Sequence, residues 1–401
     1  MPNKLSGFFE KYLKKEPLFI DKKILQASYT PETIPHREKQ IEHVANILAP
    51  SLKLEKPSNL FIYGKAGTGK TLTIKSIINN VDEIVKEKGI DLKFFYLNCK
   101  LKRVADTEYR LIAQLARMFG KEVPATGLPT DEVYKIFIEA IDDKKQLLIL
   151  VLDEIDQLVN KMGDGILYNL TRLNPELQNA EISLIGISNN LFFMNNIDAR
   201  VKSSLSEEEL VFPPYNALQL QDILRKRSKL SFRKNVIKKG VIEKCAAYAA
   251  REHGDARRAL DLLRVAGELA ERKGDKSIGI EHIDEAEEKI ENDMVLEIIN
   301  TQPKQFQLTL YSIISVCALN NKGISTGDVF GVYRDNCLKV GLKPLTHRRV
   351  SDIINELDMM GIITGRVISK GRYGRSKEIT LALPSANVLK VEEVLKDTLS
   401  L

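Results

Sequence analysis

The eight residues "GKAGTGKT", from Gly64 to Thr71, have the spacing of a phosphate-binding loop. An apolar run precedes them and a helix-like run follows, which is the context that such a loop requires. Glycines let backbone N–H groups approach phosphates, and a helix N-terminus adds positive potential. We therefore expect Lys70 to reach the β and γ phosphates and the Thr71 hydroxyl to bind Mg²⁺, against the alternative of an ordinary glycine-rich turn. The predicted contacts of the loop are Gly64, Lys65, Ala66, Gly67, Thr68, Gly69, Lys70 and Thr71.

Two acids close a second apolar run, "LLILVLDEID". Asp153 is predicted to hold Mg²⁺, directly or through water, and Glu154 to orient and deprotonate an attacking water. A helix-capping role is the alternative for both. The later run "SLIGISNN" ends in amides, one of which could lie between that water and the γ-phosphate, although a plain turn residue has the same pattern.

The order of elements predicts three domains. Five apolar β-type runs alternate with helical stretches between about 59 and 215, which is typical of an α/β layer with a parallel sheet and helices on both faces. Residues 216–300 read as helices only, several closed by glycine. From 301 to 401, helical segments precede "GIITGRVISK" and "SKEITLAL", the order of a winged helix. The predicted domains are therefore 1–215, 216–300 and 301–401.

One helix of the last domain has two distinct faces. Val350, Ile353, Ile354 and Leu357 recur at helical spacing and predict a buried stripe. Arginine and asparagine on the opposite face can pair with guanine and adenine edges in a major groove, but any exposed amphipathic helix looks similar. The predicted DNA contacts of this helix are Arg348, Arg349, Ser351 and Asn355.

The stretch "SKGRYGRSKE" joins the two β-type runs of the last domain. Gly371 and Gly374 allow a turn, so the stretch is predicted to be a hairpin wing whose basic groups meet phosphates or a minor groove. A solubilising tail is a poorer interpretation because β-type runs flank it. The predicted contacts are Lys370, Arg372, Tyr373, Arg375 and Lys377.

The charge is concentrated near the C-terminus. The net formal charge is +6, and residues 303–401 carry 14 Lys and Arg against 9 Asp and Glu. A basic module favours a polyanionic partner, although a solvated charged surface gives the same count. The four cysteines form no metal-binding spacing and no apolar run is long enough to span a membrane, so we expect a cytoplasmic, nucleoid-associated protein with no membrane partner.

Taken together, these motifs resemble the AAA+ ATPases, and within them the initiator clade of archaeal and eukaryotic origin-recognition and cell-division-cycle proteins. "YTPETIPHREKQI", "DARVKSSL" and "GDARRAL" complete the likeness, which covers nearly the whole chain. The resemblance implies an AAA+ domain, a helical lid and a winged helix, with ATP or ADP and Mg²⁺ as cofactors. It also implies an initiator-specific helical insert near 100–130 that touches DNA, with Lys102 and Arg103 as candidates, against the alternative of a plain extra helix pair.

The resemblance also assigns roles. Asn189 is the expected first sensor, Arg200 the finger that reaches a neighbouring subunit's nucleotide, and Arg257 the second sensor from the lid. Two choices stay open, because Asn190 follows Asn189 and Arg258 follows Arg257. His36 and Arg37 are expected beside the adenine, and Tyr215 is expected as a further nucleotide contact.

The function that this resemblance implies is an initiator that binds double-stranded DNA at replication origins. It would use ATP binding and slow hydrolysis as a switch, help recruit the replicative helicase, and allow other initiator paralogues on adjacent DNA sites. Two alternatives are a DNA motor of the branch-migration type and a nucleotide-binding DNA regulator without significant turnover. Rapid DNA-stimulated hydrolysis by a stable ring would favour the motor.

Overall fold

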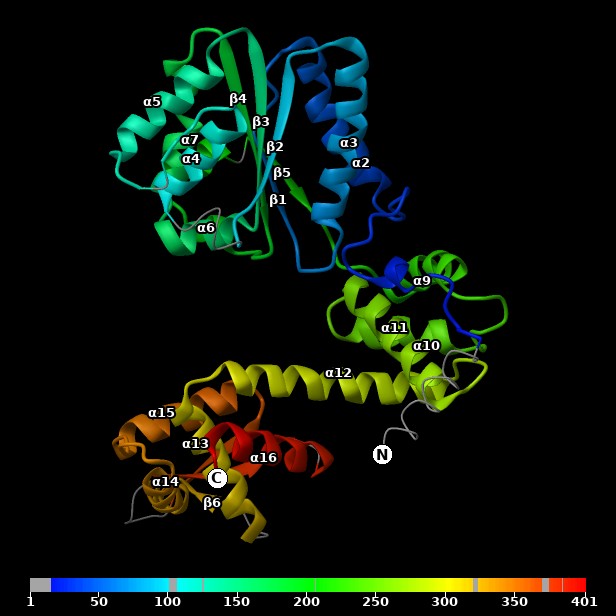
Figure 1. The fold of residues 1–401 in the computed structure, drawn as a ribbon, viewed down its shortest axis with the longest axis vertical. Coiled ribbons are helices and arrows are strands. Elements are labelled where there is room, and N and C mark those ends of the chain that lie inside the picture. The colour runs from blue at the N-terminus through cyan, green and yellow to red at the C-terminus, as the bar shows by residue number, and fades with distance from the viewer. Residues whose placement is uncertain are drawn as a thin grey trace, which may run out of the picture. The chain divides into compact units, whose positions relative to one another are not determined.

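The computed structural model describes residues 16–100, 107–124, 126–205, 207–319, 324–369, 375–383 and 385–401. The chain divides into two compact units, Met1–Ile283 and Asp284–Leu401, which are described separately below (Figure 1). No helix within the described ranges combines the length and the apolar character needed to cross a membrane.

A parallel sheet forms the centre of the first unit. Its strand order is β2-β3-β4-β1-β5, and every neighbouring pair is parallel, which confirms the predicted sheet. The order places β1, which leads into the phosphate loop, next to β4, and β4 next to β3, which ends in the acidic pair. Parallel strands bring their carboxyl ends to one edge, so these three strand ends meet there. The strands are β1 (Leu60–Tyr63), β2 (Leu92–Asn98), β3 (Gln146–Asp153), β4 (Ala180–Ser188) and β5 (Glu208–Val211).

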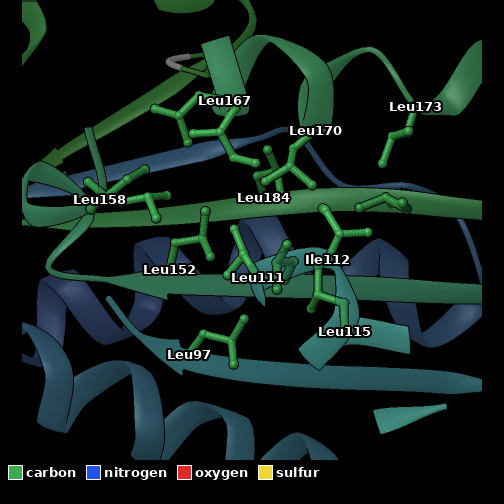
Figure 2. Close-up of a cluster of buried hydrophobic side chains, with 14 of the residues drawn as sticks. Leu97, Leu111, Ile112, Leu115, Leu152, Leu158, Leu167, Leu170, Leu173 and Leu184 are labelled. Carbon is green, nitrogen blue, oxygen red and sulfur yellow. The ribbon is translucent and has the colours of Figure 1, made fainter. Parts of the chain in front are cut away.

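Helices cover both faces of this sheet (Figure 1). One face carries α2 (Glu38–Leu48) and α3 (Lys70–Lys88), whose apolar side chains form a core with β1, β3 and β4. The opposite face carries a larger core, in which leucines of strands and helices converge (Figure 2). The helices of that face are α4 (Glu108–Met118), α5 (Thr130–Ile141), α6 (Ile155–Met162) and α7 (Gly165–Thr171).

The predicted helical insert corresponds to α4 and α5, which connect β2 to β3. Leu111, Ile112 and Leu115 of α4 and Phe137 of α5 are fully buried in the sheet core, so both helices are part of the α/β layer. Lys102 and Arg103 lie outside the described residues. The role of the insert in DNA contact therefore stays a prediction.

Helices alone follow the last strand of the first unit. Asn216 caps the first of them with a reciprocal capping box to Gln219, and Gly274, at φ 85°, ends the third, as its position after a helix predicts. Phe19, from the segment before the sheet, pairs with Phe232 and so ties that segment to this helical region. The helices are α9 (Ala217–Ser231), α10 (Val241–Arg251), α11 (Ala256–Lys273) and the start of α12 (Ile280–Thr301), whereas α8 (Ala199–Leu205) lies before β5.

The second unit has the helix and strand order of a winged helix. Its sheet has the order β6-β8-β7 and is antiparallel, and β7 and β8 form the predicted hairpin. The two-residue strand β6 was not predicted, because a run that short leaves no periodic pattern. The elements are α13 (Lys304–Leu319), β6 (Ile324–Ser325), α14 (Thr326–Val340), α15 (His347–Met359), β7 (Ile363–Ser369), β8 (Arg375–Leu381) and α16 (Ser385–Leu399).

Candidate nucleotide site and nucleic-acid interface

The phosphate loop holds a buried lysine. Gly67 and Gly69 have φ values of 71° and 92°, a left-handed backbone that other residues rarely adopt, and α3 begins directly after them. Lys70 is 4% exposed, and its Nζ donates to the carbonyl oxygens of Gly64 at 2.7 Å and Lys65 at 2.8 Å. Burial lowers the pKa of Lys70 to about 8, Asp153 partly opposes this shift, and the nearby charge of Arg257 adds to it.

The acidic strand end faces the phosphate loop. Asp153 is buried, and its Oδ2 accepts hydrogen bonds from the Thr71 hydroxyl at 2.8 Å and from the Tyr96 hydroxyl. Burial and Asp153 together raise the pKa of Tyr96, so its hydroxyl stays protonated and donates. Tyr96 was not singled out from the sequence. Its only sign there is a tyrosine two residues before the end of the strand that pairs with the acidic strand.

Glu154 has strained backbone geometry. Its φ and ψ are 56° and 46°, in the left-handed region, although glutamate has no special tolerance for this conformation. Its N–H donates to Asp153 Oδ1 at 2.9 Å, and Glu154 is one of the residues that line the nucleotide cavity. Backbone strain of this kind typically costs about 1–3 kcal/mol and persists where surrounding structure enforces it, often at active sites.

The amides at the end of β4 have different surroundings. Asn189 lines the cavity, whereas the Oδ1 of Asn190 accepts the N–H of Phe192 at 2.9 Å and so belongs to a turn. Asp156 holds this strand end, because its Oδ1 accepts from the Ser188 hydroxyl at 2.9 Å and from the Asn189 N–H at 3.4 Å. The geometry therefore favours Asn189 as the amide that faces a nucleotide.

The helical lid contacts the phosphate loop through the start of α11. The Ala256 N–H donates to the Gly67 carbonyl at 3.2 Å, and the Asp255 carboxylate lies so close that a Cβ on Gly67 would be 1.6 Å from its Oδ1. Asp255 also caps α11, since its Oδ1 accepts the N–H of Arg257 at 2.7 Å. Lid and loop are thus fitted to each other at these residues.

The two lid arginines point to different partners. Arg257 lines the cavity together with Lys70. Arg258 has a side chain only 13% exposed and pairs with Glu252 at 3.1 Å between Nε and Oε2. The structure therefore favours Arg257 as the arginine that faces a nucleotide.

Arg37 and His36 lie outside the lining of the cavity, and their expected place beside an adenine stays a prediction. Arg37 is buried, and its guanidinium donates to the carbonyl oxygens of Thr68 at 2.9 Å and Pro213 at 2.6 Å. It also lies 3.8 Å from the centre of the Tyr215 ring. The His36 Nε2 is 3.1 Å from an Asp222 carboxylate oxygen. Arg37 thus supports the phosphate loop by donating to the carbonyl of Thr68, and it links the loop to Pro213.

A cavity of about 380 Å³ extends from the loop to the lid, and its far end is suited to a base. The Arg227 guanidinium lies 4.4 Å from the centre of the Tyr29 ring there and donates to the Ile24 carbonyl at 3.1 Å. No motif marks this end in the sequence, because irregular backbone and the two lid helices α9 and α11 build it. Its lining includes Tyr29, Pro31, Thr33, Ile34, Pro35, Ile223, Arg227, Leu230 and Leu260.

The remaining predicted residues of the first unit lie beside or away from this cavity. Gly64, Lys65, Ala66 and Thr68 shape the loop, and the Thr68 hydroxyl donates to the Lys65 carbonyl at 2.9 Å. Tyr215, by contrast, lines the cavity, and its contact with a nucleotide stays a prediction. The Arg200 side chain is 70% exposed and pairs with Asp198 at 3.1 Å. Arg200 is therefore on the surface, as a residue that serves another subunit must be.

These residues fit a Mg²⁺–nucleotide. The Lys70 ammonium is held only by main-chain carbonyls on the loop, and the Thr71 hydroxyl and Asp153 carboxylate, the two expected metal ligands, are already in contact. Oxygen ligands of this type are those that Mg²⁺ prefers. Lys70 and Arg257 are two of the cations that line this cavity, and their charges near the loop suit a polyphosphate.

In the second unit, α15 has the predicted two faces. Val350, Ile353, Ile354 and Leu357 are buried in the core of this unit, which confirms the stripe. Arg348, Arg349 and Asn355 are exposed, and Ser351 is half-buried with its hydroxyl donating to the His347 carbonyl at 2.9 Å. Arg349 makes a surface ion pair with Glu356 at 3.4 Å.

The tip of the hairpin falls outside the described residues, and with it Lys370, Arg372 and Tyr373. Arg375 begins β8, and Arg366, which the sequence analysis missed, is exposed on β7 opposite Glu378. The Lys377 ammonium is 2.7 Å from Asp358 of α15, in an ion pair at the base of the hairpin. Its expected DNA contact stays a prediction.

Comparisons with known proteins agree with this architecture. A model of the AAA domain matches residues 54–195, one of the Cdc6 AAA+ ATPase-type lid domain matches 221–288, and one of the CDC6 C-terminal winged helix domain matches 297–391. The ORC1-type DNA replication protein of Pyrococcus furiosus is 50% identical over 405 residues, which span 99% of this chain and 96% of that protein.

Two more relatives cover nearly the whole chain. ORC1-type DNA replication protein 1 of Methanosarcina mazei is 50% identical over 96% of this chain and 93% of its own length. The solved structure of the Aeropyrum pernix ORC1 protein in complex with DNA is 42% identical, with a TM-score of 0.80 over 94% of this chain and 97% of that one. This chain therefore belongs to the ORC1-type DNA replication proteins, a family of AAA+ initiators with a Cdc6-type lid and winged helix.

Proposed function

We propose that this protein binds double-stranded DNA at replication origins through its winged-helix unit. The observation that carries the proposal is the division of α15 into a fully buried apolar stripe and an outer face with Arg348, Arg349 and Asn355. Such a helix can enter a major groove, where arginine and asparagine meet base edges and phosphates. The DNA complex of the 42% identical Aeropyrum pernix protein supports the same assignment.

The first unit is proposed to bind and slowly hydrolyse ATP. Lys70 and Arg257 would hold phosphate oxygens from two sides, and Thr71 with Asp153 would hold Mg²⁺, which supplies charge neutralisation when bound. Glu154 is the candidate base, because it lines the cavity, directly after the acidic strand end, and its backbone is strained. The Asn189 amide would position the water that Glu154 deprotonates.

Nucleotide state is proposed to act as a switch through the lid. The lid N–H of Ala256 and the Asp255 carboxylate touch the phosphate loop directly, so a phosphate bound there changes what the lid can contact. Exposed Arg200 would complete a neighbouring subunit's site when paralogues occupy adjacent DNA sites. Recruitment of the replicative helicase is proposed from the family alone.

Footprinting on genomic origin fragments, with ATP, with ADP and without nucleotide, tests this function. We expect protection of defined sequences whose extent depends on the nucleotide. The Glu154→Gln variant should bind ATP and DNA as the parent does, while single-turnover hydrolysis falls about 100-fold or more. Protection scattered without sequence preference would refute origin recognition, and equal turnover by variant and parent would refute the role of Glu154.

A further inference from the structure

A small network joins the wing hairpin to α15. The Lys377 Nζ of β8 donates to Asp358 Oδ2 at 2.7 Å and to Asn355 Oδ1 at 2.8 Å. The Lys377 side chain is only 18% exposed, and the hydrogen bond from Lys377 holds the pKa of Asp358 below its usual range, which favours the carboxylate form of Asp358. All three residues lie within the second unit.

Gly365 of β7 makes room for this network. A Cβ at this position would lie 1.9 Å from Lys377 Cε and 2.9 Å from Asp358 Oδ2, so any side chain would displace the lysine. The Gly365 N–H also donates to Asp358 Oδ1 at 3.2 Å. Strand and helix therefore both fix the Asp358 carboxylate, and the carboxylate fixes the lysine.

The lysine determines which way the Asn355 amide faces. An ammonium has three donors and no acceptor, so only the amide oxygen can face Lys377. The Asn355 Nδ2 must then point away from Lys377. Asn355 is exposed, and within the described part of the chain no residue accepts a hydrogen bond from this nitrogen.

We propose that Asn355 reads DNA through its amide donor, with Lys377 as the positioning residue that turns the amide oxygen toward the hairpin and the nitrogen away from it. This inference rests on the proposed DNA binding by α15. A free asparagine pairs with adenine through both its donor and its acceptor, whereas a donor alone matches the N7 and O6 acceptors of guanine. A donor is opposed by the cytosine N4 amino group. The base read by Asn355 is therefore guanine, which has two acceptors, ahead of adenine and thymine, which have one each, and cytosine is excluded.

The rival role for Lys377 is an ordinary phosphate contact of the wing. The two roles differ in measurable ways. A phosphate contact contributes about 0.9 to the slope of log affinity against log salt and gives no base preference. A positioning residue contributes to base preference and leaves the slope unchanged, because its charge is already paired with Asp358.

The test measures relative affinities of the full-length protein for a pool of duplexes randomised at each position of a footprinted site. In the parent, we expect one position where guanine is preferred over adenine by about fivefold, the low end of base discrimination by a hydrogen-bonded side chain. Asn355→Asp, which is isosteric but only accepts, should change that position to cytosine. Lys377→Met should free the amide oxygen to accept a hydrogen bond from adenine. The preference for guanine over adenine should then disappear, while the slope of log affinity against log salt stays the same.

Lys390→Met is the matched control, because it removes one exposed lysine from α16, an element that contributes no residue to this network. It should leave the base preference intact. Melting curves show whether each variant is folded. If Lys377→Met does not fold, the base preference of Asn355→Asp alone tests the inference. No change of preference in Asn355→Asp, or a slope lowered by about 0.9 with preference retained in Lys377→Met, would overturn the inference. Both results leave DNA binding itself standing, whereas a parent that binds no DNA refutes the proposed function.

Discussion

The depressed pKa of Lys70 predicts that nucleotide affinity falls as pH rises above about 8. Burial favours the neutral amine in the free protein, with a pKa of about 8. Phosphates next to the amine would favour the ammonium and raise the pKa to its ordinary range or above. Binding therefore requires a proton whenever Lys70 is neutral, and the affinity decreases as the neutral fraction grows.

The magnitude follows from this pKa. The neutral fraction rises from about one tenth at pH 7 to about nine tenths at pH 9, so Kd should increase about tenfold, or about 1.4 kcal/mol, over this range. Calorimetry in buffers of different ionisation enthalpy should show uptake of about half a proton per nucleotide at pH 8. The stability of the free protein should change with pH in the opposite direction to its nucleotide affinity. A lysine with a lowered folded pKa destabilises the free protein at low pH, and this cost is lost as pH rises from about 8 toward 10.5.

Two variants isolate the effect. Lys70→Arg keeps its charge throughout, so its Kd, although weaker, should not vary between pH 7 and 9 through this residue. Arg257→Ala removes a charge that lowers the pKa of Lys70, so its inflection should move to higher pH. A parent Kd that stays constant from pH 7 to 9, or an equal rise in Lys70→Arg, would refute the account.

Three further substitutions test the packing around both sites. Arg257→Ala should weaken ATP binding about tenfold, because Arg257 lines the cavity. Arg258→Ala should leave ATP binding unchanged and lower the unfolding free energy by about 1.5 kcal/mol, because Arg258 pairs with Glu252. Nucleotide titrations and thermal melts of the two variants measure these effects. Gly67→Ala should cost about 1–3 kcal/mol and weaken nucleotide binding, since its Cβ meets Asp255 and its φ is 71°; normal binding would contradict the lid contact. Ile354→Ala should destabilise the second unit by about 2–5 kcal/mol in denaturant titrations, and a change below 1 kcal/mol would contradict the buried stripe.

The sequence was most informative where a physical requirement is local. Runs such as "LLILVL" are apolar enough to specify a strand buried on both faces, and the glycines of the loop are needed for its left-handed backbone. The stripe of α15 was predictable for the same reason, since helical period alone places Val350, Ile353, Ile354 and Leu357 on one side.

Side chains whose partners are distant in the chain were predicted poorly. Arg37 was expected beside a base, but its direction is set by the carbonyls of Thr68 and Pro213, which no local pattern reveals. In the sequence, Lys377 is one more basic residue of a predicted wing. In the structure it packs against α15, because Gly365 leaves room for its side chain and Asp358 pairs with its ammonium. The choice between Arg257 and Arg258 likewise depended on Glu252, the partner of Arg258.

The electrostatics of the cavity give the proposed switch a physical basis. Lys70 and Arg257 belong to different parts of the first unit, the phosphate loop and the lid, and the charge of Arg257 lowers the pKa of Lys70. In the free protein their repulsion opposes the lid contact, and the carboxylates of Asp153, Asp156 and Asp255 offset it. A polyphosphate between them turns this repulsion into attraction on both sides. Loss of one phosphate weakens that attraction, so the energy of lid contact depends on which nucleotide is bound.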